Sequence, residues 1–348
     1  MSPSQATQRR ARRLPAAVVV VVGLGVLLLS IVTAISFGPS DLSVGNVWDV
    51  LANKLGFGPD PGLTPLRVAT IWDLRLPRVL LAAAAGAGLS LCGVIMQSLL
   101  RNPLAEPYLL GVSSGASTGA VLILVMGLGG GLVSFPAGAF IGSLAAFAAT
   151  LGLSRLAGGT TDKIVLAGIA VTQGFSALTS FIIMVGADAN TTRGVLYWLM
   201  GSFASVSWTD VALSATVLAG FLLLTMFMAG SLDAFMFGEQ EAATLGVSVH
   251  ATRIILLGGA ALMTAVVVSS SGAIGFVGLV LPHIARLLVG SRHRALLPVS
   301  AVFGAIFLLW ADTIARAAFA PLEVPVGVIT ALVGVPIFAT ILARTRKR

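Results

Sequence analysis

The segment from Leu74 to Ser117 constrains this chain more than any other, because it alternates apolar runs with clusters of arginine and proline. About 20 apolar or small residues follow the sequence R-L-P-R at Arg75 to Arg78, which is the length a helix needs to cross roughly 30 Å of hydrocarbon. A second cluster, R-N-P-L-A-E-P, begins at Arg101, where a helix can end without leaving unpaired backbone groups in lipid. The pattern predicts a helical hairpin inside a membrane protein with several spans.

The composition supports a membrane protein. Of the 348 residues, 57% are hydrophobic and only 10% are charged, and the mean hydropathy is +1.01, whereas soluble domains carry about 25% charged residues. The net charge of +8 does not indicate nucleic-acid binding, because the basic residues lie at the ends of apolar runs rather than in an aromatic-rich patch. The single cysteine, Cys92, excludes an intrachain disulfide and a cysteine metal cluster.

Ten stretches have the composition of membrane spans, so the sequence predicts an all-α fold with about ten transmembrane helices. They run over Ala16–Ser36, Val79–Leu100, Pro107–Met126, Leu132–Ser154, Ile164–Gly186, Trp208–Ala229, Arg253–Ser270, Ile274–Val289, Leu296–Ala315 and Val324–Ala343. One transmembrane domain, residues 16–343, is expected between two basic tails, residues 1–15 and 344–348.

The distribution of basic residues predicts the orientation of these spans. With both termini in the cytoplasm, only six of the 21 lysines and arginines fall on the outer side. These six are Lys54, Arg67, Arg75, Arg78, Arg193 and Arg316. Because cytoplasmic loops carry the excess of basic residues, the asymmetry favours cytoplasmic termini.

Three connecting segments are long enough to carry structure of their own. The outer loop 37–72 is expected to hold a helix over about 44–55, and V-L-Y-W-L-M-G-S-F at 195–203 is expected to lie at the membrane interface. The cytoplasmic loop 230–252 is expected to form two short helices, one capped by Ser231 and ended by Gly238, the other ended by Gly246. This loop is either a solvated connector or a docking element for a cytoplasmic partner.

Five motifs in order resemble the permease subunit of the FecCD type, from binding-protein-dependent ABC importers of iron–siderophores, haem and cobalamin. They are R-L-P-R at 75–78, N-P-L-A-E-P-Y-L-L-G-V-S-S-G-A at 102–116, G-E-x-x-A-x-x-L-G-V at 238–247, G-F-V-G-L-V-L-P-H-I-A-R at 275–286, and A-D-T-I-A-R with E-V-P-V-G-V-I-T-A-L-V-G-V-P-I-F at 311–338.

The resemblance implies a type II ABC importer permease in the bacterial cytoplasmic (inner) membrane, with no cofactor. The expected partners are two cytoplasmic ATPase subunits, a second permease subunit (a copy of this chain or a homologue), an extracytoplasmic substrate-binding protein and membrane lipid. A ferric siderophore is the expected cargo, with haem and cobalamin as alternatives.

The resemblance also implies roles for particular residues. Arg75, Arg78 and Arg316 would dock the binding protein, although arginines at helix ends also serve as plain interface anchors and Arg316 has Asp312 as a neighbour four residues away. Gly238, Glu239, Ala242, Leu245 and Gly246 match the motif that couples to the ATPase, and Asn102, Leu104, Thr161 and Asp162 match the cytoplasmic gate. Asp162 departs from the small hydroxyl residue expected there and is alternatively a helix cap.

Polar residues in the fifth span are expected to line the pore, with helix–helix hydrogen bonding as the alternative role. They are Thr172, Gln173, Ser176 and Thr179.

Motifs that the chain lacks separate it from other classes. A phosphate-binding loop needs glycine directly before lysine, but Lys54, Lys163 and Lys347 follow asparagine, aspartate and arginine. We therefore expect a transporter permease rather than an enzyme, with ATP hydrolysed on a separate subunit. An ion-coupled secondary transporter is the competing class, but it would bury several ionisable groups near the bilayer centre, where these spans are nearly free of them.

Overall fold

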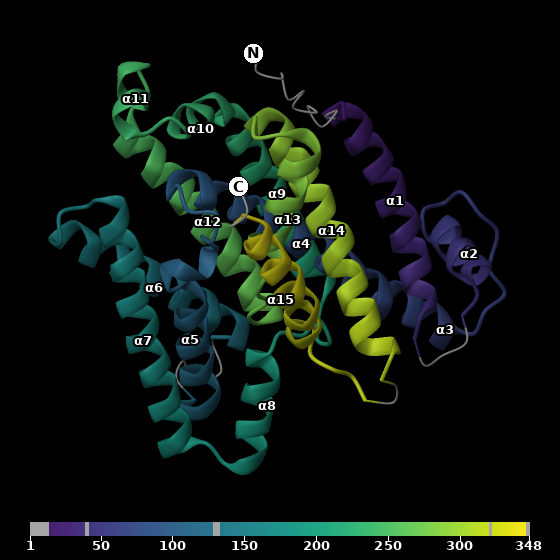
Figure 1. The fold of residues 1–348 in the computed structure, drawn as a ribbon. Helices are drawn as coiled ribbons and strands as arrows, with labels where there is room; N and C mark the ends of the chain where they lie inside the picture. The colour runs from purple at the N-terminus through teal and green to yellow at the C-terminus, as the bar shows by residue number, and fades with distance from the viewer. Residues whose placement is uncertain (1–13, 39–41, 128–132, 320–321, 346–348) are drawn as a thin grey trace.

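The computed structural model describes residues 14–38, 42–127, 133–319 and 322–345, and this part of the chain is helical with no strand. Figure 1 shows the long helices running side by side. They are α1 (Ala16–Ser36), α4 (Leu76–Leu99), α5 (Val112–Met126), α6 (Phe135–Leu156), α7 (Thr161–Gly186), α9 (Trp208–Phe227), α12 (Val249–Ser271), α13 (Val277–Val289), α14 (His293–Ala317) and α15 (Val326–Thr345).

Shorter helices connect these elements. They are α2 (Val44–Lys54), α3 (Pro65–Ala69), η1 (Thr70–Arg75), η2 (Pro107–Leu110), α8 (Ala189–Leu199), α10 (Ala229–Phe235) and α11 (Glu239–Thr244). The helices α10 and α11 lie with the start of α1 at the top of Figure 1, which is the predicted cytoplasmic side.

The predicted all-α membrane fold is confirmed. Seven helices in the described residues are long and apolar enough to cross a membrane, and three shorter apolar helices, within α5, α13 and α15, accompany them. These ten helices correspond one to one with the ten predicted spans. The helix expected in the outer loop is present as α2, and the two short helices expected in the loop 230–252 are present as α10 and α11.

Several predicted boundaries and one predicted cap are wrong. The span expected from Pro107 begins as the 3₁₀ helix η2, and α5 starts only after Gly111, whose φ of +78° ends that turn. The span expected from Ile274 starts at Val277, because Phe276 adopts a φ of +68° just before α13. Met228, not Ser231, is the cap residue of α10. The predicted span start at residue 132 and most of both basic tails lie outside the described residues.

Helix α4 occupies the centre of the bundle. In the most apolar window of the continuous helix 65–99, 89% of the residues are buried. Its neighbours approach so closely that a Cβ added to Gly93 would lie 1.9 Å from the carbonyl oxygen of Gly278, and one added to Gly86 would lie 2.1 Å from that of Gly304. Small residues allow this backbone contact, which is the usual source of helix association in membranes.

Helix ends and the loops beside them meet at a junction inside the bundle. The backbone N–H of Ser202 donates to the Ser271 carbonyl (2.7 Å), and that of Val326 donates to the Gly201 carbonyl (3.0 Å). The Tyr108 hydroxyl donates to the carbonyl of Ile274 (2.9 Å) and accepts from its N–H (2.8 Å). These bonds satisfy backbone groups that cannot be left unpaired within a membrane protein.

The Tyr108 hydroxyl generates a prediction. Replacing it, Tyr108→Phe, leaves both backbone groups of Ile274 without this partner and is expected to cost about 1–3 kcal/mol. The melting temperature in detergent should therefore fall. Tyr197→Phe is the matched control, because within the described residues the Tyr197 hydroxyl has no hydrogen-bond partner. Equal melting temperatures of the two variants would contradict this account of the junction.

Candidate functional site

The three predicted docking arginines lie together at the predicted outer side. Arg78 on α4 donates to both carboxylate oxygens of Asp312 on α14 (2.9–3.1 Å) and to Glu323 in the following loop (3.0 Å). The Asp312 side chain is 1% exposed and that of Glu323 is 41% exposed. A bidentate guanidinium–carboxylate contact is a strong, directional interaction, so Arg78 fixes α4 against α14.

Arg75 and Arg316 bind the end of α1. Arg75 donates to the carbonyls of Ile35 (2.8 Å) and Ser36 (3.3 Å), and Arg316 donates to those of Ala34 and Phe37. The last carbonyls of a helix have no partner within it, and cations there are favourable. Both arginines are buried, so the structure gives them a role in joining α1 to the bundle. Their docking role stays a prediction.

The outer arginines still border open space. A cavity of about 430 Å³ is lined by Arg75, Arg78, Arg316 and Glu323. The expected pairing of Arg316 with Asp312 is loose, at 3.7 Å, because the carboxylate of Asp312 is directed to Arg78.

On the opposite side, α10 and α11 present apolar side chains to the surroundings. Gly238 (φ +128°) separates the two helices, and Gly246 (φ +83°) follows α11. Ala242 is fully buried, whereas Phe237 is 71% and Leu245 is 68% exposed. Of the predicted coupling residues, Ala242 therefore holds α11 in place and Leu245 is available to a partner.

The predicted gate residues occupy two turns. The Asn102 side chain accepts from the N–H of Leu104 (2.9 Å) and shapes the turn after α4, leaving Leu104 45% exposed. Thr161 is the first residue of α7 and bonds Glu239 on α11. The cap position of α7 is held by Thr160, so the capping alternative for Asp162 is wrong; Asp162 lies in the first turn, where a negative charge is favourable.

The predicted pore residues divide between two environments. The hydroxyl of Thr179 is buried and forms a hydrogen bond with that of Thr118 on α5 (2.7 Å). Thr179 therefore has the alternative role, helix–helix hydrogen bonding, rather than lining a pore. Gln173 and Ser176 are exposed on α7, and Thr172 is half-buried. Gln173, Ser176 and Ser180 follow one another at helical spacing and so share one face of α7.

The sequence did not reveal a cluster of Ser98, His293 and Asp233. His293 lies 2.6 Å from the Ser98 hydroxyl through Nε2 and 2.7 Å from Asp233 through Nδ1. The sequence of contacts from serine to histidine to aspartate is that of a hydrolase catalytic triad. The Ser98 hydroxyl, however, donates its hydrogen to the Val94 carbonyl in its own helix (2.8 Å). Asp233 in turn accepts the backbone N–H of His293 (2.9 Å). These bonds give the cluster a structural role, connecting α10, α4 and α14.

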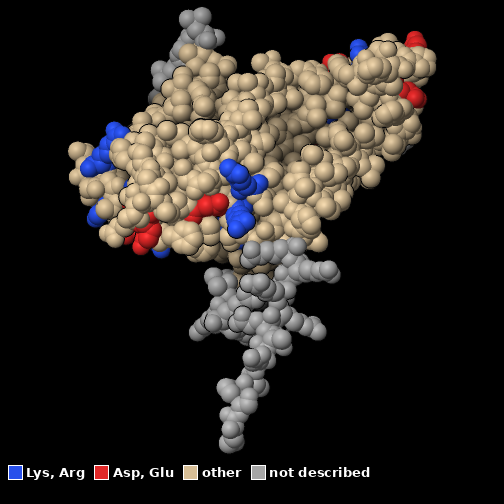
Figure 2. Space-filling model, turned by 90° about the horizontal axis from the view of Figure 1, so that it is seen from above, with Lys and Arg blue, Asp and Glu red and all other residues tan. Residues whose placement is uncertain are grey.

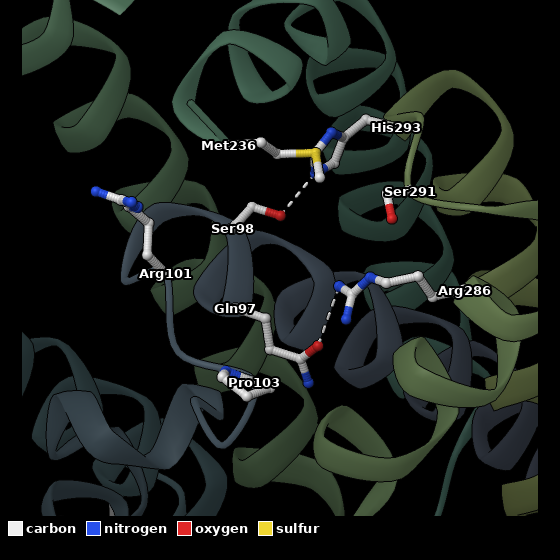
Figure 3. A pocket seen from close by; sticks show the side chains of 8 residues that line it. All are labelled: Gln97, Ser98, Arg101, Pro103, Met236, Arg286, Ser291 and His293. Atoms are coloured by element: carbon white, nitrogen blue, oxygen red, sulfur yellow. Dashed lines mark hydrogen bonds between the residues drawn. The ribbon is translucent and has the colours of Figure 1, made fainter. Parts of the chain in front are cut away.

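The same region contains a cavity of about 310 Å³, lined by Gln97, Ser98, Met236, Arg286 and His293 among others. In Figure 3, Arg286 and Gln97 point toward each other across it, whereas the guanidinium of Arg101 points away from both. Gln97 accepts from Arg286 (3.2 Å) and donates to the carbonyl of Leu279 on α13 (3.2 Å). Arg286 of the P-H-I-A-R motif thereby fixes the contact between α4 and α13.

The two carboxylates that bind Arg78 allow a matched test. Asp312→Asn removes the buried countercharge of Arg78 and is expected to cost about 3 kcal/mol. Glu323→Gln removes a half-exposed countercharge of the same arginine and should cost less than about 1 kcal/mol. The fall in melting temperature should thus be several times larger for Asp312→Asn, and equal falls would refute the assignment of the buried pair.

Comparisons with known proteins show the family of this chain. Residues 26–344 match the family model described as the FecCD transport family. The chain is 37% identical over 334 residues to a hemin transport system permease of Yersinia pestis, covering 93% of this chain and 96% of the relative. It is 34% identical over 346 residues to an iron(3+)-hydroxamate import system permease of Bacillus subtilis, covering 99% of this chain and 88% of the relative.

A solved structure has the same fold. It is an inward-facing conformation of a metal-chelate type ABC transporter, with a TM-score of 0.81 and 29% sequence identity. The match covers 94% of this chain and 99% of that one. The ten apolar helices, the motifs in order and these matches lead to one conclusion: the chain is an ABC transporter permease and belongs to the FecCD transport family.

Proposed function

We propose that this permease forms half of a pathway that imports a ferric siderophore, delivered by an external binding protein and driven by ATP hydrolysis on separate subunits. The observation that carries the proposal is the polar face of α7. Gln173, Ser176 and Ser180 are exposed on a helix whose most apolar window is only 17% buried. Polar side chains in a span normally face a protein interior or a water-filled path rather than lipid.

A second permease subunit provides that environment. Because α7 lies at the edge of the chain in Figure 1, its polar face is positioned to meet a second subunit. The pathway would then run between the two subunits, lined by neutral amide and hydroxyl groups. Such a lining suits a bulky chelate that must pass without being held.

The exposed apolar residues of α10 and α11 are the proposed contact with the ATPase. Met236, Phe237 and Leu245 are 45%, 71% and 68% exposed beyond the ends of the spans. Figure 2, which views the molecule from this side, shows charged side chains in a few small groups on an otherwise uncharged face. Large exposed apolar side chains on a cytoplasmic surface are typical of a protein–protein interface.

The proposed cargo is a whole chelate rather than a bare metal ion. Iron(III) is a hard cation that calls for a cluster of oxygen or nitrogen ligands, and the described residues contain no group of three or more His, Cys, Asp or Glu suited to a metal. Two related permeases are named for hemin and for iron(3+)-hydroxamate. In both compounds the iron is held by an organic chelator. Cobalamin is the third candidate.

Reconstitution tests this proposal. The permease, its ATPase and its binding protein are placed in proteoliposomes, and uptake of a ferric siderophore, haem and cobalamin is compared. We expect ATP-dependent and binding-protein-dependent uptake of the ferric siderophore. Uptake of another of the three would correct the cargo, and uptake driven by an ion gradient without ATPase would reject the importer mechanism.

The ATPase contact generates a separate prediction. Phe237→Asp places a charge in the proposed interface and should weaken ATPase binding by tenfold or more, because interface cores exclude charged residues. Phe57→Asp is the control, since Phe57 is 88% exposed but lies in the loop between α2 and α3, away from α10 and α11 in Figure 1. Equal ATPase affinity of the two variants, measured in detergent, would show that the interface lies elsewhere.

A further inference from the structure

The carboxylate of Glu239 joins three elements that are distant in the sequence. Glu239 is the first residue of α11. Its Oε1 accepts a hydrogen bond from the hydroxyl of Thr161 (2.7 Å), 78 residues away at the start of α7. The same oxygen forms an ion pair with Arg253 on α12. Charge-assisted hydrogen bonds of this kind are about twice as strong as neutral ones.

Arg253 extends this contact to the loop before α7. Its Nη1 lies 3.4 Å from the carbonyl oxygen of Gly159, to which it donates. Gly158 and Gly159 have φ values of +108° and +70°, a region that side chains disfavour. Arg253 is almost fully buried, whereas the Glu239 side chain is 39% exposed. The loop, α11 and α12 are therefore held by one buried guanidinium and one accessible carboxylate.

Arg101 brings the other predicted gate segment to the same place. It adopts a φ of +47°, which is strained for a residue with a side chain. Its guanidinium lies beside α11, since a Cβ added to Gly238 would be 3.7 Å from Nη1, and it points away from Gln97 and Arg286 in Figure 3. The turn 101–104 thus places a cation beside the residue that precedes α11.

The charge state of Glu239 depends on these neighbours. Burial disfavours the charged form, but the hydrogen bond from Thr161, the ion pair with Arg253 and the positive charge of Arg101 outweigh it. The pKa of Glu239 consequently lies below its ordinary value. The carboxylate is ionised at neutral pH and binds both Thr161 and Arg253.

We propose that Glu239 is a positioning residue that ties α11 to the two turns that hold the predicted gate residues, residues 101–104 and 159–162, so that a displacement of α11 moves them together. The proposal rests on the proposed function, in which an ATPase binds α10 and α11, and it takes that binding to displace α11. It adds to that function a specific route, through one carboxylate, from the ATPase contact to the gate.

The contact can be tested on the permease alone. Nitroxide labels are placed at Gln240 and Lys163, which are exposed at the starts of α11 and α7; the native Cys92 is buried. We expect a narrow distance distribution that broadens in Glu239→Gln and in Thr161→Val. Thr161→Ser, which keeps the hydroxyl, should restore the narrow distribution. Glu241→Gln, which removes the same charge from the same helix, should also keep it.

The consequence for transport is measured in proteoliposomes with the ATPase and the binding protein. Glu239→Gln and Thr161→Val should each lower the number of cargo molecules moved per ATP by roughly three- to tenfold. Because the two side chains share one contact, the double variant should be no worse than the poorer single variant. A purely structural defect would lower ATP hydrolysis and transport together and leave their ratio unchanged.

The possible results distinguish a failure of the role proposed for Glu239 from a failure of the proposed function. If the wild type transports and both variants keep the wild-type ratio, the role of Glu239 is overturned. If the wild type shows no ATP-driven transport, the proposed function fails, and the label distances still decide whether Glu239 holds α11 against the start of α7. Unchanged distances in Glu239→Gln and Thr161→Val would overturn the inference in either case.

Discussion

The backbone contact of α4 with its neighbours is the interaction on which the rest of the structure depends. Gly93 meets Gly278 on α13 and Gly86 meets Gly304 on α14, at distances that leave no room for a Cβ atom. In a membrane, burying apolar surface gives little drive for helices to associate, so such close contacts supply much of it. With α4 enclosed in this way, the bundle has one rigid centre.

This centre determines what the remaining helices expose. Helices α12, α13 and α14 pack against α4, whereas α7 stays at the edge with its polar face uncovered. The charged groups are concentrated at the two ends of the bundle, where Arg78 meets Asp312 and Arg253 meets Glu239. Helix α4 runs from the first of these clusters to the turn 101–104, so it mechanically connects the predicted docking face with the predicted gate.

The sequence predicted the elements more accurately than the contacts between them. Apolar runs and flanking charges located all ten apolar helices, and the glycines at 238 and 246 correctly marked the break between α10 and α11 and the end of α11. The start of α13 was missed, because Phe276 takes a φ of +68° that no local pattern signals. The Ser98–His293–Asp233 cluster joins residues 195 and 60 positions apart, so spacing along the chain could not reveal it. Glu239 was found through its motif, but its bonds to Thr161 and Arg253 arise only when three helices meet.

The most direct test of the central claim asks what covers the polar face of α7. Fluorescent labels at Ser176 on α7 and, as the control, at Val21 on α1 are compared in the assembled transporter in nanodiscs containing brominated lipid. Val21 is 69% exposed and Ser176 is exposed in the single chain. The account predicts strong quenching by lipid at Val21 and weak quenching at Ser176, which a second permease would shield. Equal quenching at both positions would place α7 against lipid and contradict the pathway between two subunits.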